Sequence, residues 1–160
     1  MTNKAIFGAG CFWGVEQMFK TANGVIETEV GYTGGHTENP TYEGVCRGDS
    51  GHIESVSVTY DTAKTTYKDL VKFFFEIHDF EQKNGQGLDI GSQYLSVIFY
   101  CDDEQKEVAE KVISELRAKG YDSATKLEKA TKFWPAEEYH QDYYAKTGGS
   151  AYCHIWRKVF

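Results

Sequence analysis

Apolar residues along the chain repeat with two different periods, which predict where the strands and helices lie. Runs rich in β-branched and aromatic residues predict strands, and apolar residues three and four positions apart predict helices. Asp102 with Gln105 is a plausible helix N-cap, and Gly120 a helix end. In chain order we expect a strand at residues 4–7, a helix from 12, strands at 25–32 and 53–60, a helix around 70–77, a strand at 93–100, a helix at 102–120, a strand at 125–131 and a helix at 135–146.

Two long polar segments separate these elements. Residues 31–51 and 79–92 are rich in glycine and polar side chains, and each leads into or out of a strand. Loops of this length inside a compact domain are usually functional. We therefore look for functional residues where these two segments meet the strands.

The order of the elements predicts the fold class. Two strand–helix–strand units, followed by a helix and a strand, match the split βαβ pattern. Helices should then pack on one face of a mostly antiparallel sheet. We predict an α+β, two-layer sandwich that forms a single domain over residues 1–160. Gly148, Gly149 and Ser150 predict a flexible C-terminal tail from about residue 147.

Composition and charge narrow the range of functions. The 160 residues are 41% hydrophobic, which suffices for one core, and carry a formal net charge of −7. An acidic chain has no basic field for phosphates, which argues against nucleic acid and anionic membranes as partners. No apolar run approaches the ~18 residues of a spanning helix, and residues 1–15 lack the pattern of an export signal. We expect a cytoplasmic protein.

The four cysteines are widely spaced: Cys11, Cys46, Cys101 and Cys153. The chain has no Cys-x-x-Cys pair and no matching pair of histidines, so a zinc site is not expected. A reducing compartment with one or two working thiols fits this spacing better.

Cys11 is the leading candidate for a nucleophile. It lies where a strand gives way to a helix, and the unpaired N–H groups and dipole of a helix start favour a thiolate. Gly10 and Gly14 let the backbone approach a ligand, while Phe12 and Trp13 offer an apolar cradle for a thioether or sulfoxide methyl group. The alternative is a buried cysteine that fills space beside two core aromatics.

The same glycines loosely match a dinucleotide-binding fingerprint, with Glu29 following at about twenty residues. However, the later strands do not alternate with helices as a doubly wound sheet requires. Phe12 and Trp13 would also crowd a pyrophosphate. We therefore expect no nucleotide cofactor.

Glu54 is predicted to point into the core. Alternation along residues 53–60 places it on the same face as Val56, Val58 and Tyr60. Desolvation raises a carboxyl pKa, so Glu54 could stay protonated near neutral pH and act as a general acid. Its place at the start of the strand leaves open that it turns out to solvent.

Further polar residues flank the two long segments. Tyr32 precedes the first, Tyr94 follows the second, and either hydroxyl could hydrogen-bond a substrate oxygen, although most of the 11 tyrosines must be packing residues. Asp89 is of a type that commonly forms turns. His140 could pack or hydrogen-bond within its predicted helix.

Cys153 lies in the predicted tail, where mobility would let its thiol reach another thiol. We interpret it as a resolving cysteine, with a free surface thiol as the alternative. Cys101 ends an apolar strand and is expected to be structural, whereas the role of Cys46 stays open.

Several motifs, in order along nearly the whole chain, resemble the A-type peptide methionine sulfoxide reductases. They are Gly-Cys-Phe-Trp-Gly at residues 10–14, Gly-Tyr-Thr-Gly-Gly at 31–35, Thr-Tyr-Glu-Gly-Val-Cys at 41–46, Gly-His-Ile-Glu-Ser-Val at 51–56, Phe-Glu-Ile-His-Asp at 75–79, Asp-Ile-Gly-Ser-Gln-Tyr at 89–94, Phe-Trp-Pro-Ala-Glu-Glu-Tyr-His at 133–140 and Tyr-Cys-His at 152–154.

The resemblance implies a ferredoxin-like α+β sandwich and the reduction of methionine S-sulfoxide, free or in proteins. It implies that Cys11 is the nucleophile, that Glu54 donates the proton, and that Tyr32 and Tyr94 bind the sulfoxide oxygen. By the same matching, Phe12 and Trp13 hold the substrate methyl group, Asp89 helps to order the polar pocket, and Cys153 is the recycling thiol.

We hypothesise a cycle in which Cys11 becomes a sulfenic acid and then forms a disulfide with Cys153. Thioredoxin, or dithiothreitol in vitro, would restore the thiols, and neither a metal nor a bound cofactor is required. The chain departs from the family at Phe80, Leu88 and Leu95, where proline, asparagine and arginine are common, and in having one tail cysteine. A single tail cysteine argues against a double disulfide relay, with Cys46 as the fallback partner.

Two other function classes stay open. A cysteine hydrolase or acyltransferase would need a histidine base beside Cys11 and would form no disulfide. A non-catalytic methionine- or peptide-binding module would bind its ligand equally well as Cys11→Ser and turn nothing over.

Overall fold

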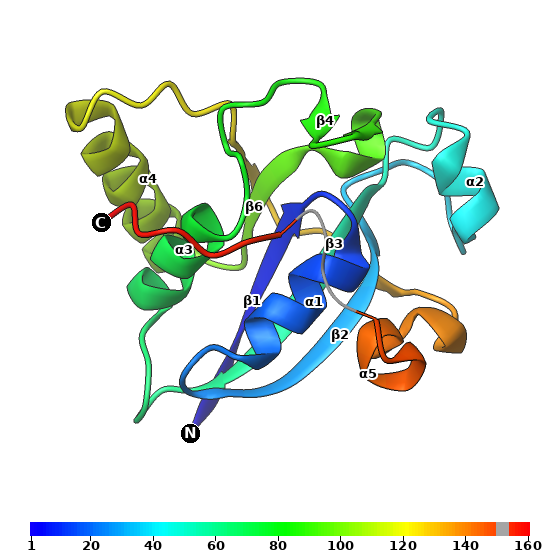
Figure 1. The fold of residues 1–160 in the computed structure, drawn as a ribbon, viewed down its shortest axis with the longest axis horizontal. Coiled ribbons are helices and arrows are strands. Elements are labelled where there is room, and N and C mark those ends of the chain that lie inside the picture. The colour runs from blue at the N-terminus through cyan, green and yellow to red at the C-terminus, as the bar shows by residue number, and fades with distance from the viewer. Residues whose placement is uncertain (150–153) are drawn as a thin grey trace.

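The computed structural model describes residues 1–149 and 154–160, and its centre is one six-stranded sheet (Figure 1). The strand order is β7-β6-β1-β3-β2-β8, and β4 and β5 form a separate two-stranded hairpin. The strands are β1 (Thr2–Ala9), β2 (Val25–Thr33), β3 (Ile53–Asp61), β4 (Gly85–Gln86), β5 (Asp89–Ile90), β6 (Ser96–Tyr100), β7 (Lys126–Lys129) and β8 (Trp134–Pro135).

Within the ranges that the structure describes, three helices of nine residues or more and two short ones accompany the sheet. They are α1 (Phe12–Lys20), α2 (Tyr42–Cys46), α3 (Tyr67–Glu76), α4 (Asp103–Ala118) and α5 (Tyr143–Thr147), with 3₁₀ turns at Ser92–Tyr94 and Glu138–His140. The predicted cap is confirmed, because the Asp102 carboxylate accepts the backbone N–H of Gln105 at 2.8 Å.

The chain is α+β, as predicted, but the mostly antiparallel sandwich with a ferredoxin-like core is wrong. The sheet is mixed, because β6 and β7 pair in parallel whereas the other pairs within this sheet are antiparallel. A parallel pair needs a long crossover connection, and the 16-residue helix α4 supplies it. β7, which falls within the strand expected at residues 125–131, and the unexpected β8 form the two edges of the sheet.

Two hydrophobic clusters lie on opposite faces of this sheet. On one face, Phe7 stacks against Phe19 of α1 at 5.2 Å and Phe74 of α3 at 5.0 Å between ring centroids, and α4 adds apolar side chains to the same cluster. Burying each such ring stabilises the fold by roughly 1.5–3 kcal/mol. Residues of the opposite parity, such as Ile6 and Phe99, form a smaller cluster.

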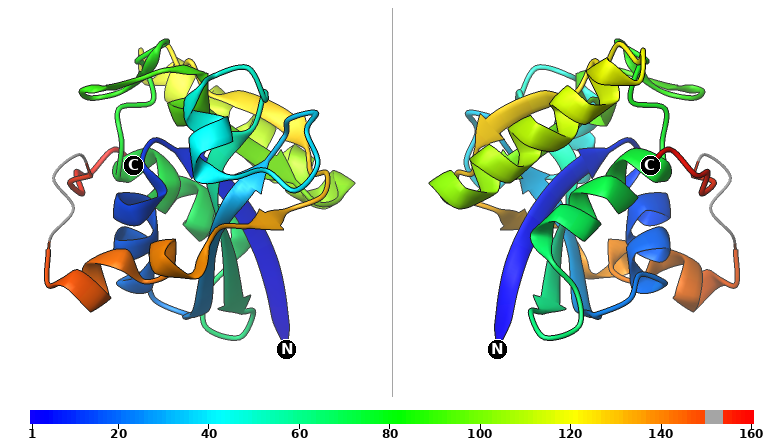
Figure 2. Two further views of the ribbon diagram at one scale, coloured as in Figure 1. Left: turned by 90° about the vertical axis from the view of Figure 1, so that its right-hand side faces the viewer. Right: turned by 90° about the vertical axis from the view of Figure 1, so that its left-hand side faces the viewer.

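The predicted helix over residues 135–146 is also wrong. This segment contains β8, a 3₁₀ turn and the short α5, and it runs along the edge of β2 (Figure 2). The amide side chain of Gln141 accepts the Val30 N–H and donates to the Val30 carbonyl, both at 2.9 Å. Hydrogen bonds to the open edge of β2 therefore take the place of the hydrogen bonds that a local helix would form in this segment.

The two long polar segments hold more structure than expected. The first contains α2, and the second contains the β4–β5 hairpin and the 3₁₀ turn that ends at Tyr94, so β6 begins only at Ser96. Glycines with positive φ at Gly87 and Gly91 allow the hairpin's turns. Hydrogen bonds between residues close in sequence form α2, the hairpin and the 3₁₀ turn, and the pattern of apolar residues does not reveal them.

The end of the chain returns to the body of the protein beside α3 (Figure 1). The N–H groups of Arg157 and Val159 donate to the backbone oxygen and to Oε2 of Glu76 at 2.9 and 3.0 Å. His154 is 2% exposed. Cys153, the predicted recycling thiol, lies outside the described residues, and the flexibility of the tail stays a prediction.

Candidate active site

Cys11 is the N-cap residue of α1, at the turn where the predicted nucleophile was expected. Its φ is −52° and its ψ 117°, and its carbonyl accepts the N–H groups of Gly14 and Val15 at 3.2 and 3.3 Å. Gly10 has a φ of +95°, a left-handed conformation that glycine adopts without strain. The tight turn from β1 into α1 thus holds a partly buried thiol at the helix start.

The thiol does not have the lowered pKa that a helix start suggests, so this expectation is wrong. Burial and the nearby Glu54 raise the pKa of Cys11 to about 12, against the opposing hydrogen bonds from the N–H groups of Trp13 and Gly14. Desolvation of the charged form outweighs the helix start. At neutral pH Cys11 therefore carries its proton.

Glu54 points inward, as strand parity predicted, and is 1% exposed. Its Oε1 accepts the backbone N–H of Phe12 at 3.3 Å, and within the described part of the chain its Oε2 has no hydrogen-bond partner. Burial raises the pKa of Glu54 to about 8, and the charge of Asp89 adds to this. A neutral carboxylic acid thus lies beside the turn that carries Cys11.

Asp89 lies in β5 and is half-buried. Its charge raises the pKa of both Cys11 and Glu54, after the larger effect of burial. The β4–β5 hairpin therefore brings Asp89 into the electrostatic environment of the site, beyond the turn-forming role that its residue type suggests.

The two tyrosines chosen from the sequence approach Glu54 from different elements. Tyr32 pairs directly with Glu54 in the β2–β3 register, is fully buried, and donates its hydroxyl proton to Oε1 of Glu137 at 2.9 Å. Tyr94 is half-buried at the end of its 3₁₀ turn. Burial, and after it the charge of Glu54, raises the pKa of Tyr94, so its phenol stays protonated.

Phe12 and Trp13 have different environments. Phe12 is fully buried, with its ring centroid 5.6 Å from Tyr32 and 5.2 Å from His140. Trp13 is partly exposed, stacks on Tyr143 at 3.7 Å, and donates its indole N–H to Nδ1 of His140 at 2.8 Å. Only Trp13 therefore presents solvent-accessible surface, while Phe12 supports it from within.

Tyr42 and Glu137 belong to the same cluster but were not singled out from the sequence. Tyr42, on α2, lies 4.5 Å from the ring of His140, and its backbone N–H donates to Oε2 of Glu137 at 3.1 Å. Both residues lie inside motifs that carry the resemblance, at residues 41–46 and 133–140. Their place inside these motifs was the sequence feature that could have marked both residues as members of the site.

His154 was also missed as a site neighbour. Its Nε2 donates to the carbonyl of Ala9 at 2.6 Å, and its ring lies where a side chain on Gly14 would be. Its Nδ1 is buried without a partner in the described part of the chain. The residue that follows Cys153 is thus fixed against the turn that carries Cys11.

The other two cysteines differ in their relation to the site. Cys46 ends α2 and is exposed, and its pKa is raised by burial, against a hydrogen bond from Tyr42, with Glu54 and Glu137 adding to the rise. Cys101 is exposed after β6, and apart from burial the groups that act on it are Asp102 and Lys4. Cys46 therefore lies near the site and Cys101 does not.

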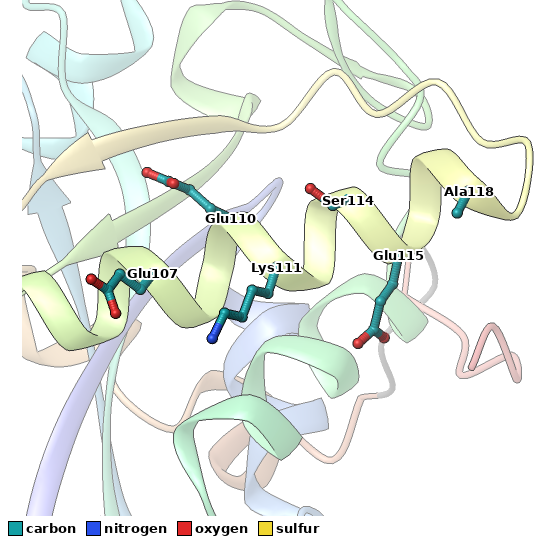
Figure 3. A pocket seen from close by; sticks show the side chains of 6 residues that line it. All are labelled: Glu107, Glu110, Lys111, Ser114, Glu115 and Ala118. Carbon is teal, nitrogen blue, oxygen red and sulfur yellow. The ribbon is translucent and has the colours of Figure 1, made fainter.

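A hollow on the outer surface of α4 is lined by charged side chains of that one helix, among them Glu107, Glu110 and Lys111 (Figure 3). Across the described ranges, no group of three His, Cys, Asp or Glu residues could hold a metal ion.

In the same ranges no helix is long and apolar enough to cross a membrane.

Comparison with known proteins decides the family. The profile of the family described as Peptide methionine sulfoxide reductase matches residues 3–159. The chain belongs to this family. It is 51% identical over 146 residues to the Peptide methionine sulfoxide reductase MsrA of Methanococcus maripaludis, covering 91% of this chain and 93% of that one. The MsrA of Nautilia profundicola is 47% identical over 150 residues, with 94% and 87% covered.

Solved structures of the family agree with this assignment. Reduced Mxr1 from Saccharomyces cerevisiae superposes with a TM-score of 0.92 at 34% identity, covering 98% of this chain and 93% of that chain. Mxr1 in complex with Trx2 shares the fold, with a TM-score of 0.67 at 22% identity and 98% and 91% covered. The family prediction is confirmed: the chain is a methionine sulfoxide reductase, not a hydrolase or a binding module.

Proposed function

We propose that this reductase acts on the S epimer of methionine sulfoxide, free or in proteins, with Cys11 as nucleophile and Glu54 as general acid. The observation that carries the proposal is the hydrogen bond between the Phe12 N–H and Glu54, which joins a buried neutral acid to the turn that holds the thiol. Trp13, backed by Phe12, forms the wall for the methyl group.

The reduction step follows from the protonation states of the two groups. A sulfoxide sulfur becomes electrophilic as its oxygen is protonated, and Glu54 supplies that proton while Cys11 attacks the sulfur. The proton of Cys11 passes to the Glu54 carboxylate, which restores the acid. Oxygen moves to Cys11 and methionine leaves. The Cys11 sulfur is oxidised by two electrons to a sulfenic acid, and the methionine sulfur is reduced by two.

The two tyrosines contact the substrate oxygen at different stages of this mechanism: Tyr94 donates to the sulfoxide oxygen, whereas the proton of Tyr32 is held by Glu137, so Tyr32 is a partner for the S–OH group once it forms. Tyr94 and Tyr32 flank Glu54 from a 3₁₀ turn and from β2, and both keep their phenolic protons because burial raises their pKa values. Preorganised partners for the developing S–OH group lower the barrier without reorganisation. Asp89 contributes by keeping Glu54 protonated.

Recycling restores the thiol. Cys153 attacks the Cys11 sulfenic acid, a disulfide forms and water leaves, after which thioredoxin reduces the disulfide to two thiols. The complex of Mxr1 with Trx2 supports a partner of this kind. The proposal includes three further points. Residues 1–160 form one domain, the tail is flexible from about residue 147, and Cys153 reaches Cys11 during the cycle. We also propose that the protein is cytoplasmic. The cycle uses only cysteine thiols for electron transfer and needs no bound cofactor.

Turnover of separated S and R epimers by wild type and by Cys11→Ser tests the proposal. The S epimer alone should be reduced, and Cys11→Ser should form no methionine. Without an added reductant, wild type should form one methionine per enzyme and lose two thiols. Reduction of the R epimer at a similar rate, or methionine formation by Cys11→Ser, would contradict it.

A further inference from the structure

One carboxylate ties together three segments that surround Glu54. Oε1 of Glu137 accepts the hydroxyl proton of Tyr32 at 2.9 Å, and Oε2 accepts the backbone N–H of Tyr42 at 3.1 Å. Tyr32 belongs to β2, Tyr42 begins α2, and Glu137 lies between β8 and the following 3₁₀ turn. These contacts join residues 105 and 95 positions apart in sequence.

Both contacts require Glu137 to act as an acceptor. Burial opposes the ionisation of Glu137. The hydrogen bonds from the Tyr42 N–H and, with a smaller effect, from the Tyr32 hydroxyl outweigh burial and lower the pKa of Glu137. A carboxylate at neutral pH has no proton to donate. The orientation of the Tyr32–Glu137 bond is therefore fixed, with the proton on Tyr32.

A phenol has one proton, and Glu137 occupies that of Tyr32. The Tyr32 oxygen, in a side chain that is fully buried and directly opposite Glu54 in the sheet register, is left with lone pairs alone for any further contact. A bare sulfoxide oxygen is also an acceptor. The two oxygens have no proton to share until Glu54 has protonated the substrate.

We propose that Glu137 is a positioning residue that holds Tyr32 as a hydrogen-bond acceptor for the S–OH group formed as the sulfoxide is protonated. Tyr32 then contacts the transition state and not the bound substrate. Interactions of that kind raise the limiting rate without tightening substrate binding. The inference rests on the proposed roles of Glu54 and Tyr32 and assigns Glu137 a part in the same step.

The test measures the reduction step alone, in a single turnover without reductant. The limiting rate of methionine formation and the half-saturating concentration of free methionine S-sulfoxide are compared for wild type, Tyr32→Phe, Glu137→Ala and Glu137→Leu. The last variant replaces most of the lost volume in case the alanine variant does not fold. Both Glu137 variants should lower the limiting rate about 10- to 100-fold and change the half-saturating concentration less than about 3-fold.

Glu138→Ala is the matched control. Glu138 is the neighbouring carboxylate, with a side chain 89% exposed and paired with Lys146, and its removal should leave both parameters within about 2-fold of wild type. Glu137→Gln is the partial rescue variant, since its amide oxygen can accept the Tyr32 proton while its NH2 group then faces the Tyr42 N–H that Oε2 accepts in wild type. It should recover at least about 3-fold of the rate lost in Glu137→Ala; no recovery would overturn the inference.

A double-variant cycle separates positioning from general support of the fold. If Glu137 acts through Tyr32, then Glu137→Ala or Glu137→Leu combined with Tyr32→Phe should be about as slow as Tyr32→Phe alone. The inference would be overturned if the rate losses of the two single variants multiplied in the double variant. It would also be overturned if the Glu137 variants raised the half-saturating concentration instead of lowering the limiting rate. A slow Tyr32→Phe beside a normal Glu137→Leu would overturn it and leave the proposed function intact. A wild type that forms no methionine from either epimer would refute the proposed function itself.

Discussion

The backbone N–H of Phe12 donates to Oε1 of Glu54 at 3.3 Å, although the two residues are 42 positions apart in the sequence. Phe12 follows Cys11 directly, so this bond ties the start of α1 to the first residues of β3. The turn that carries the thiol and the strand that carries the acid are thereby joined directly. Burial, against the effect of this bond, keeps the proton on Glu54, and burial together with Glu54 keeps the proton on Cys11.

Glu54→Gln should keep the bond to Phe12, because an amide oxygen also accepts a hydrogen bond, but it removes the acid. We expect the single-turnover rate of methionine formation to fall about 10²- to 10⁴-fold, the usual contribution of a general acid. Glu29→Gln, an exposed carboxylate on β2, is the control. A rate within a few-fold of wild type would show that the proton comes from elsewhere.

The raised pKa of Glu54 also predicts how stability depends on pH. The folded protein holds this proton up to about pH 8, whereas the ordinary pKa of an exposed glutamate is 4.5. Between these values the folded state binds more protons than the unfolded state, so stability falls as pH rises. Denaturant unfolding from pH 5 to 9 should show wild type losing a few kcal/mol relative to Glu54→Gln. Parallel pH curves would contradict the assignment.

The two candidate resolving thiols can be separated by the choice of reductant. Cys153→Ser should stop turnover with thioredoxin but not with dithiothreitol, because a small dithiol reduces a sulfenic acid directly. Cys46→Ser, which removes the exposed thiol beside the site, should cycle normally with both. Normal thioredoxin turnover by Cys153→Ser, together with failure of Cys46→Ser, would transfer the resolving role to Cys46.

Gly14 and His154 should behave as a coupled pair. A methyl group on Gly14 would collide with the His154 ring, which is fixed to the carbonyl of Ala9. Gly14→Ala should lower the free energy of unfolding by about 1–3 kcal/mol, as overpacking does. Adding His154→Ala should return part of that loss, measured by chemical denaturation. Additive losses in the double variant would show that the clash is relieved in another way.

Gln141 should matter for stability through its two bonds to Val30 and a third, from its amide to the Ala136 carbonyl at 3.1 Å. Gln141→Leu leaves the Val30 N–H on the edge of β2 unpaired, while the Val30 carbonyl keeps the N–H of Ala136 at 2.9 Å. This loss should cost about 1–3 kcal/mol of unfolding free energy. Glu138→Ala in the same segment should stay within about 0.5 kcal/mol of wild type. Equal stabilities for the two variants would mean that water replaces Gln141 at this edge.

Local rules on the sequence determined much of the framework. Alternation along residues 53–60 placed Glu54 inward, and the Asp102–Gln105 pattern gave the N-cap of α4. The change from a strand pattern to a helical apolar pattern placed Cys11 at a helix start. The motifs identified the family. Each of these depends on neighbours within a few positions, where the geometry of a strand or helix fixes the relation between residues.

Tertiary structure decided what depends on distant partners. The parallel pairing of β6 with β7 and the short β8 in place of a helix depend on which strand edges are open, and local periodicity does not record this. Desolvation, which raises the pKa of Cys11 against the helix start, exists only once the site is closed. The bond between Tyr32 and Glu137 spans 105 positions. Burial and long-range hydrogen bonding belong to the folded chain, so the sequence indicated the candidate groups and the fold determines which of them carry protons.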